Sequence, residues 1–400
     1  MGEPPTRLGD GWLGLQRLSA FSQQQVSRRD DMNEAGVLAL FLQLVQLASP
    51  SRHEGKVAAF CAKELKRLGF RVEFDGAGDF LAADTGNLIA TLDGDASRVP
   101  LLLIAHMDTV APGTGIRPQL GKDGIIRADG SAILGADDKA GITAILAALQ
   151  ELVGNEIPHG PIQVVLTIAE ELGLQGSARF DPARLSAQFG LCLDAEGEPG
   201  TFVVSAPSQV RWQADVLGRA APVGGASENG TSAIQVATRA VARIPHGRVD
   251  ADTTVHIGAF IGEGPTERMR DRVRLVGEAR GLHHQRLLQV LRKMERTFAQ
   301  VAKAHGASVD FSFAVTCMGF AFAPDHPLLR MAETAARRAG LTPRWVVHGE
   351  GSEAHRFTAM GVPTLNAGVG YRDIHTSKER IALADLVRTA RLVYEFLVLA

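Results

Sequence analysis

The chain has 400 residues, a formal net charge of −2 at pH 7 and 45% hydrophobic residues, which is enough for two hydrophobic cores and predicts two domains. No Lys/Arg-rich run stands out, so the composition argues against nucleic acid or a membrane surface as partner and favours small, roughly neutral substrates. Cys61, Cys192 and Cys317 form no CxxC pair, and no apolar stretch reaches the ~20 residues that span a bilayer, so we expect a cytoplasmic protein with free thiols.

The first half of the chain predicts an α/β domain. Residues 1–31 lack the apolar core of a signal peptide, and we expect a loose polar N-terminal extension there. Helical or strand periodicity follows in the segments 35–47, 57–68, 71–74, 87–92, 101–104, 142–153, 162–168 and 189–193. Segments 35–47, 57–68 and 142–153 are predicted helices. The other five are predicted strands, several of them apolar throughout, as in strands covered on both faces. This alternation predicts a mixed, largely parallel sheet with helices on both faces.

The second half predicts a smaller unit inserted into the first domain. Its segments follow the order strand, helix, strand, strand, helix, strand: 210–217, 232–244, 253–260, 272–279, 284–304 and 309–315. The α/β pattern resumes with a helix at 328–339, a strand at 362–365 and a helix at 383–397. We therefore expect a discontinuous domain of residues 32–207 and 317–400, and a βαββαβ insertion of residues 208–316.

Residue types that bind metals are found where the predicted strands end or where a predicted helix begins: His106, Asp108, Asp137, Glu170, Glu171 and Asp194. Each alone has an ordinary explanation, since an Asp before a helix is usually an N-cap and a strand-end His is usually structural. In an open α/β sheet, however, ligands bind beyond the carboxyl ends of the strands. The combination therefore predicts one crevice that holds a metal.

The donor types favour an open catalytic site. Imidazole nitrogen and carboxylate oxygen suit zinc, and no pair of thiolates accompanies these residues to form a closed structural Cys site. Asp108 can accept the second ring N–H of His106 and fix its tautomer. Glu170 and Glu171 are adjacent in extended backbone and point in different directions, so one can bind metal while the other reaches the attacking water.

These residues belong to segments that resemble peptidase T and its relatives, a superfamily that includes carboxypeptidase G, acetylornithine deacetylase and succinyl-diaminopimelate desuccinylase. The matching segments are Ala105-His106-Met107-Asp108-Thr109, Gly135-Ala136-Asp137-Asp138-Lys139-Ala140-Gly141, Ala169-Glu170-Glu171-Leu172-Gly173, Asp194 and His375-Thr376-Ser377. The resemblance runs from about Met32 to the C-terminus. It implies a zinc-exopeptidase-type catalytic, metal-binding domain (32–207 and 317–400) with an inserted lid or dimerisation domain (208–316).

The resemblance also implies the role of each residue. Asp137 would bridge two divalent ions, zinc with cobalt or manganese as alternatives. His106 and Asp194 would complete one site, and Glu171 and His375 the other. Glu170 would be the general base, Asp108 would assist at His106, and Arg280 would bind a substrate carboxylate.

Two segments depart from the pattern of the family. A lid histidine that polarises the scissile carbonyl is replaced by Pro222, which cannot donate that hydrogen bond. Either the donor is missing, or another group such as His246, His348 or His355 serves the carbonyl; of these, His355 is the expected substrate contact. The loop usually written Gly-Gly-Gly-Ser-Asp-Ala-Asn has the sequence 349–355, Gly-Glu-Gly-Ser-Glu-Ala-His. Losing one oxyanion donor typically costs about 100- to 1000-fold in rate, so either a weakened peptidase or a shifted substrate fits.

The expected activity is that of a peptidase T-like exopeptidase of tripeptidase or dipeptidase type, active in peptide catabolism. A water between the two metals would lose its proton to Glu170 and attack the scissile carbonyl. Two alternatives stay open: an N-acyl-amino-acid amidohydrolase with the same chemistry, and a catalytically weakened protein that binds peptides through Arg280. The resemblance further allows a homodimer formed through the lid domain.

Overall fold

The computed structural model describes residues 33–224 and 229–400; the expected N-terminal extension, residues 1–31, lies outside these ranges. The described chain forms two compact units. The larger unit comprises residues 33–204, Phe322–Val347 and Ser352–Ala400. The smaller unit comprises the described part of Ser205–Ala321 together with His348–Gly351. The assignment of catalytic and lid roles to 32–207, 317–400 and 208–316 stays a prediction.

The helices of the larger unit are α1 (Glu34–Gln46), α2 (Gly55–Arg67), α3 (Ala77–Leu81), α4 (Ala136–Gly154), α7 (Pro327–Arg338), α8 (Glu353–Ala359) and α9 (Leu383–Val398), with the 3₁₀ helices η2 (Ser177–Arg179) and η3 (Pro182–Arg184). The strands of the main sheet are β1 (Arg71–Phe74), β2 (Leu88–Leu92), β3 (Leu101–His106), β6 (Ile162–Thr167), β7 (Phe189–Ala195), β8 (Thr201–Ala206), β14 (Phe320–Ala321), β15 (Arg344–Val347) and β16 (Thr364–Gly368). All lie in the larger unit except β14 and the last two residues of β8, which fall in the residue range of the smaller unit. A separate small sheet consists of β4 (Gln119–Leu120), β5 (Ile125–Arg127) and β17 (Arg380–Ala382).

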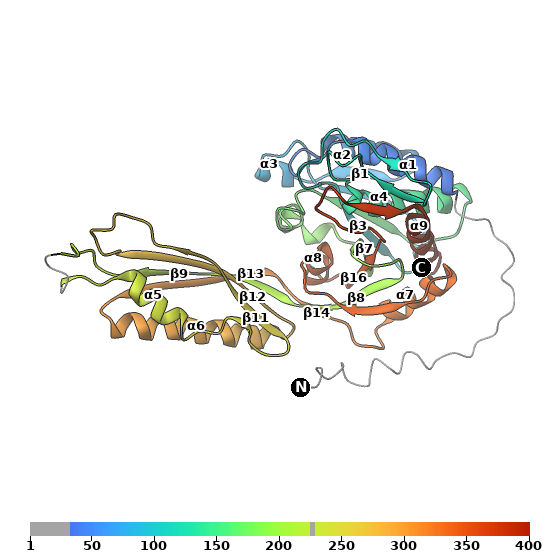
Figure 1. The fold of residues 1–400 in the computed structure, drawn as a ribbon. Helices are drawn as coiled ribbons and strands as arrows, with labels where there is room; N and C mark the ends of the chain where they lie inside the picture. Colours follow the sequence, from blue (N-terminus) through green and yellow to red (C-terminus); the bar gives the residue numbers. More distant parts are fainter. Residues whose placement is uncertain (1–32, 225–228) are drawn as a thin grey trace, which may run out of the picture. The chain divides into compact units, whose positions relative to one another are not determined.

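The main sheet has the strand order β1-β2-β6-β3-β7-β16-β8-β14, and β15 also pairs with β8. The central strands β6, β3, β7 and β16 run parallel to one another, whereas the pairs toward both edges are antiparallel. Figure 1 shows α8 and α9 on opposite sides of β7 and β16. The expected α/β fold with a mixed, largely parallel sheet is therefore confirmed.

The central strands lie where the sequence is continuously apolar. Every residue of β3 and of β6 is buried, because a parallel strand covered by helices on both faces has no solvent side. Helix α4 packs against β3, β7, α1 and α9, and all residues from Ala136 to Leu149 are buried. The sequence predicted only an apolar stripe on this helix, whereas small residues at its other positions let neighbours approach from all sides.

The smaller unit is one antiparallel sheet with two helices. Its elements are β9 (Ser208–Leu217), α5 (Ala233–Val241), β10 (Gly247–Arg248), β11 (Thr253–Ile261), β12 (Arg272–Gly281), α6 (His284–Ala304) and β13 (Ser308–Cys317). The strand order is β10-β11-β12-β9-β13, and α5 and α6 pack against the sheet.

The core of the smaller unit is built around Trp212 of β9. Its ring is fully buried and stacks on Phe311 at a centroid distance of 5.9 Å. Side chains alternate along a strand, so the neighbouring Arg211 is exposed. In the ranges that the structure describes, none of the helices combines the length and the apolar character needed to cross a membrane.

We predict that Leu103→Ala lowers the free energy of unfolding by about 2–5 kcal/mol, because deleting a fully buried core side chain leaves a cavity. Leu103 lies in β3, opposite Val164 of β6 and Leu191 of β7. Denaturant unfolding followed by circular dichroism measures the loss. Leu120→Ala is the matched control, since that side chain is 44% exposed; an equal effect of the two substitutions would contradict the burial argument.

Candidate metal centre

Five side chains from different elements of the larger unit point into one place. His106 is the last residue of β3, Asp194 lies near the end of β7, and Asp137 lies at the start of α4. Glu171 follows β6, and His375 lies in the connection between β16 and β17. Because β3, β6 and β7 are parallel, their carboxyl ends meet at one edge of the sheet, where these groups converge.

The Asp137 carboxylate lies between the two histidine rings. Its Oδ1 is 3.0 Å from His106 Nε2, and its Oδ2 is 3.2 Å from His375 Nε2. The same His375 nitrogen is 3.0 Å from the Glu171 carboxylate, and His106 Nε2 is 3.7 Å from Asp194 Oδ1. The two oxygens of one carboxylate thus face two separate sets of donors.

Two groups of donors could each hold a metal ion. One consists of His106, Asp138 and Asp194, and the other of His106, Asp137 and Glu171, with the donor atoms of each group within 4.8 Å of one another. Both groups combine imidazole with carboxylate, which is the donor set of an open zinc, cobalt or manganese site.

Asp138 is a member of the first group that the sequence analysis did not single out. Its Oδ2 accepts from the main-chain N–H of His106 and its Oδ1 accepts from the main-chain N–H of Gly141, each at 3.2 Å. The bond to Gly141, three residues on, is that of an N-cap. Since both oxygens are engaged with backbone, Asp138 holds the start of α4 beside the end of β3.

Asp108 links the metal centre to the segment that carries the two glutamates. On the side of the His106 ring away from Asp137, Nδ1 lies 3.0 Å from the Asp108 carbonyl oxygen and 3.3 Å from its Oδ1. The Asp108 carboxylate also accepts from the N–H groups of Glu170 and Glu171, at 3.0 and 3.1 Å, and from the Ser51 hydroxyl at 2.7 Å. One buried residue, through its carbonyl and its carboxylate, therefore orients the His106 ring and the backbone of Glu170 and Glu171.

The histidine and carboxylate side chains of this centre shift each other's pKa values. Burial would raise the pKa of Asp137, but hydrogen bonds with His106 and His375 outweigh it and hold that pKa below its ordinary value. The bonds with Asp137 and Glu171 raise the pKa of His375 to about 10.

The pKa values of the buried acids that do not hydrogen-bond a histidine ring shift in the opposite direction. Burial, with the neighbouring carboxylates, raises the pKa values of Asp138, Asp194 and Glu170 well above their ordinary range. A divalent cation stabilises the charged form of every carboxylate around it. The excess of buried acid over histidine is thus a charge distribution that suits bound cations.

Further buried polar residues support this centre. The Glu54 carboxylate accepts from the Ala169 N–H at 2.9 Å, where the backbone has a φ of 49°. The Tyr371 hydroxyl donates to Asp194 Oδ1 at 3.1 Å, and Asn366 Oδ1 accepts from the Asp194 N–H at 3.0 Å. Glu379 accepts from backbone N–H groups at the start of α4. None of these four residues is predicted from the sequence, because nothing in their local pattern distinguishes them from surface residues.

Lys139 is a buried cation beside this centre. Its ammonium group donates to the Leu47 carbonyl at 2.7 Å. Burial lowers the pKa of Lys139 to about 8, and the negative charge of Glu379 opposes that shift. The side chain thus connects the end of α1 to the start of α4.

The family model described as peptidase family M20/M25/M40 matches residues 102–398. The chain belongs to this family. The Bacillus subtilis protein YqjE, whose function is uncharacterized, is 35% identical to this M20 chain over 362 residues, which are 90% of this chain and 97% of YqjE.

Two solved structures share both fold and sequence with this M20 peptidase. The crystal structure of aminopeptidase PepT from Bacillus cereus has a TM-score of 0.87 and 38% identity, over 92% of this chain and 98% of PepT. A tripeptidase from Staphylococcus aureus has a TM-score of 0.87 and 34% identity, over the same shares of the two chains. The expected place in the peptidase T-like group is confirmed, and the protein is a metallopeptidase.

The two substrate-binding residues that the sequence predicted lie in different units. His355 of α8 belongs to the larger unit, is 1% exposed, and its Nδ1 accepts from the Ser352 N–H at 3.1 Å. Arg280 of β12 belongs to the smaller unit, where its Nη1 donates to the Gly349 carbonyl at 2.7 Å and its Nε contacts Glu278. Pro222 also belongs to the smaller unit and forms an isolated antiparallel β-bridge with Arg268 through the main chain. Their roles toward substrate stay predictions.

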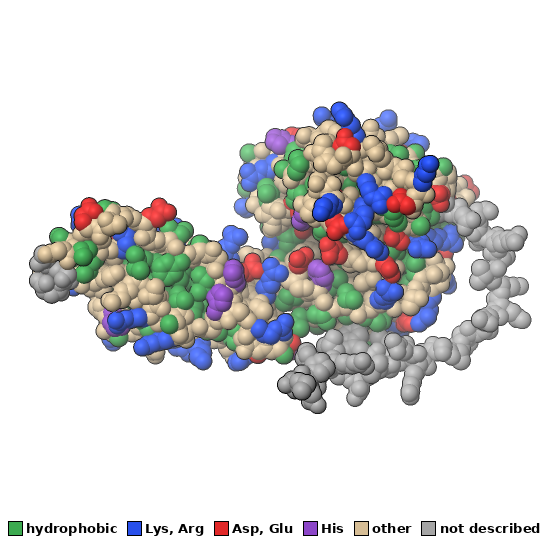
Figure 2. Space-filling view, viewed as in Figure 1, with side chains coloured by type: hydrophobic (Ala, Val, Ile, Leu, Met, Phe, Trp, Pro, Cys, Tyr) green, Lys and Arg blue, Asp and Glu red, His purple; other side chains and the backbone are tan. Residues whose placement is uncertain are grey.

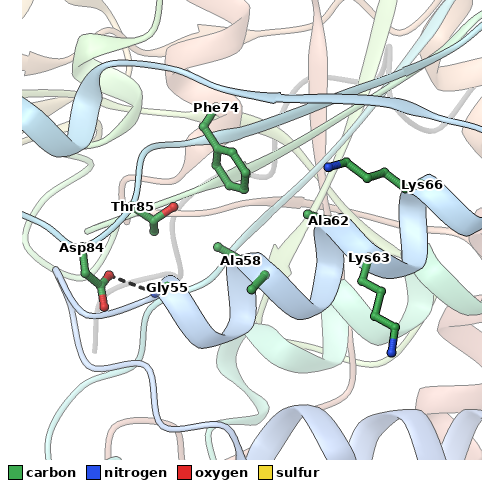
Figure 3. A pocket seen from close by; sticks show the side chains of 9 residues that line it. Gly55, Ala58, Ala62, Lys63, Lys66, Phe74, Asp84 and Thr85 are labelled. Carbon is green, nitrogen blue, oxygen red and sulfur yellow. Dashed lines mark hydrogen bonds between the residues drawn. The ribbon is translucent and has the colours of Figure 1, made fainter.

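Other features of the larger unit lie apart from these residues. A cavity of about 500 Å³ runs along α2 and includes Ala58, Lys66 and Phe74, and the N-terminal Gly55 N–H of the helix donates to Asp84 nearby (Figure 3). None of the candidate metal-centre residues lines it. Basic and acidic side chains are interspersed on the face of the larger unit seen in Figure 2. A mixed surface of this kind does not concentrate a field of one sign.

We predict that Asp108→Asn lowers the free energy of unfolding of the metal-free protein by about 1–3 kcal/mol. The amide keeps one acceptor oxygen but turns an NH₂ group toward buried N–H donors, and an unsatisfied buried polar group costs about that much. Thermal unfolding measures the difference. Asp93→Asn is the control, because Asp93 is exposed and paired with Arg71, and no measurable change is expected there; equal stability of both variants would refute the role of Asp108.

Proposed function

We propose that this metallopeptidase is an exopeptidase that hydrolyses short peptides, of tripeptidase or dipeptidase type. The observation that carries the proposal is the Asp137 carboxylate, whose two oxygens lie 3.0 and 3.2 Å from the nitrogens of His106 and His375. The similarity to aminopeptidase PepT and to a tripeptidase, each over 92% of the chain, supports the substrate class.

In this proposal Asp137 would be shared between two divalent metal ions. His106 and Asp194 complete one site, and Glu171 and His375 complete the other, with zinc as the proposed metal and cobalt or manganese as alternatives. Bound metal ions of this kind polarise a carbonyl group and make water acidic enough to lose a proton near neutral pH. Asp108 contacts Nδ1 of the His106 ring, which leaves Nε2 facing Asp137 and available as a metal donor.

Glu170 is proposed as the general base. It belongs to neither group of potential metal donors, yet its backbone is fixed next to Glu171 by Asp108. Its carboxylate oxygen takes a proton from the attacking water and returns it to the amine that leaves. The adjacent residues Glu170 and Glu171 thus have different tasks.

Arg280 and His355 are proposed to contact the substrate. The guanidinium group of Arg280 suits a terminal carboxylate, because its fork of N–H groups can bind both oxygens. In the smaller unit it donates to the Gly349 carbonyl and contacts Glu278, so a substrate carboxylate would exchange with these partners. Neither Arg280 nor His355 belongs to a group of potential metal donors, and their loss is expected to affect substrate affinity.

A panel of substrates tests the proposal. The metal-free protein is loaded with zinc, cobalt or manganese and offered dipeptides, tripeptides, tetrapeptides and N-acyl amino acids. We expect kcat/KM to be highest for unblocked di- or tripeptides and to fall for longer chains. A preference for N-acyl amino acids would instead identify an amidohydrolase, and metal binding without any turnover would identify a peptide-binding protein.

We predict that Glu170→Ala leaves the metal content near that of the wild type and lowers kcat by about 100- to 10,000-fold, which is the usual contribution of a general base. Metal analysis and peptide hydrolysis on the same samples measure both quantities. Glu333→Ala removes a glutamate of α7 that pairs with Arg337 on the surface, and is expected to change neither. Activity that survives in Glu170→Ala would remove this residue from the mechanism.

A further inference from the structure

Glu379 is a buried carboxylate that the proposed reaction does not use. It is 2% exposed. Its Oε2 accepts from the Gly135 N–H at 2.7 Å, and its Oε1 accepts from the Asp137 N–H at 3.0 Å. One carboxylate thus holds two N–H groups of the segment that delivers Asp137.

These two N–H groups lie in a stretch of backbone that cannot satisfy them by itself. Gly135 has a φ of 72°, and both Asp137 and Asp138 have non-helical dihedral angles, so the regular part of α4 begins only after Asp138. The first N–H groups of a helix have no partner within it. The Asp138 carboxylate accepts from the Gly141 N–H, and the Glu379 carboxylate accepts from N–H groups before the regular helix.

Glu379 lies on the segment that also carries His375, four residues earlier. This segment therefore contacts both the side chain and the main chain of Asp137. The His375 ring reaches the Asp137 carboxylate at 3.2 Å, and Glu379 binds its main-chain N–H at 3.0 Å. A shift of the Glu379 contact would move the carboxylate and the ring relative to each other.

The opposite half of the metal centre is held by different groups. Asp108 lies at the His106 ring, while Tyr371 and Asn366 hydrogen-bond Asp194. None of these contacts involves Glu379. Loss of Glu379 should consequently affect the two halves unequally.

We propose that Glu379 is a positioning residue, which fixes Asp137 relative to His375 and thereby forms the metal site that these two residues share with Glu171. The inference rests on the proposed function only in taking the cluster as a two-metal centre. The competing explanation is that Glu379 merely caps α4, in which case it contributes to stability and to nothing else.

Glu379→Gln distinguishes these explanations with little change in volume. The amide retains one acceptor for one of the two N–H groups and turns its NH₂ group toward the other, which leaves a buried donor without an acceptor. Groups that orient metal ligands typically change metal affinity by about 10- to 100-fold when they are replaced. Affinity for metal, rather than activity, is therefore the quantity to measure.

The experiment titrates the metal-free wild type, Glu379→Gln and Asp137→Ala with Co²⁺, by calorimetry and by the visible absorption of the bound ion. The wild type should bind two equivalents, and Asp137→Ala should bind neither tightly. For Glu379→Gln we expect one equivalent near the wild-type affinity and the second weakened by about 10- to 100-fold. Glu395→Gln is the matched control: Glu395 is also buried, pairs with Arg391 in α9, and should leave both equivalents unchanged.

Two results would overturn the inference. If Glu379→Gln binds two equivalents of Co²⁺ at wild-type affinity and only its unfolding temperature falls, Glu379 is a helix cap alone. If the affinities for both equivalents fall equally, the substitution has loosened the whole centre. If Glu379→Gln does not fold, Glu379→Asp, which keeps both acceptor oxygens on a shorter side chain, should show a smaller weakening in the same direction. A wild type that binds no metal would instead refute the proposed function, so the two failures are distinguishable.

Discussion

The larger unit depends on the interaction of one carboxylate, that of Asp137, with two histidine rings. It is buried, and a buried charge is stable only when it is paired and hydrogen-bonded. His106 and His375 provide this pairing at 3.0 and 3.2 Å, although they lie far apart in the sequence. The central parallel sheet is what brings the ends of β3, β6 and β7 together around it.

A second constraint follows from the loops that carry the metal-centre residues. Residues beyond a strand or before a helix have backbone N–H groups that no regular element satisfies. Buried carboxylates accept from these groups: Asp108 at Glu170 and Glu171, Glu54 at Ala169, Asp138 at His106, and Glu379 at Asp137. The backbone around the centre is thus held by acids that are themselves buried, which fixes the position of each donor.

The segment 349–355, which departs from the pattern of the family, acquires a physical meaning in this setting. Glu353 at the start of α8 is fully buried, and burial raises its pKa. Its negative charge is among the causes that raise the pKa of Glu170. The longer acid therefore adds to the charge around the general base that we propose, while His355 uses its Nδ1 within the first turn of α8. The departure from the family thus affects the surroundings of Glu170 rather than the metal donors.

The sequence by itself determined the α/β class, the order of most elements and the six strand-end or helix-start residues of the centre, because apolar periodicity and residue type are local properties. His375 and Arg280 came only from the resemblance, since neither stands in a pattern that predicts a metal or substrate contact. Tertiary structure alone decided which acids lie against histidine rings and which hold backbone. Asp137 and Asp138 are neighbours of identical type, yet one lies between two histidines and the other accepts from two N–H groups. Glu54 and Glu379 likewise became significant only when folding placed them against loops distant in the chain, because a hydrogen-bond partner far away in sequence leaves no trace in local composition.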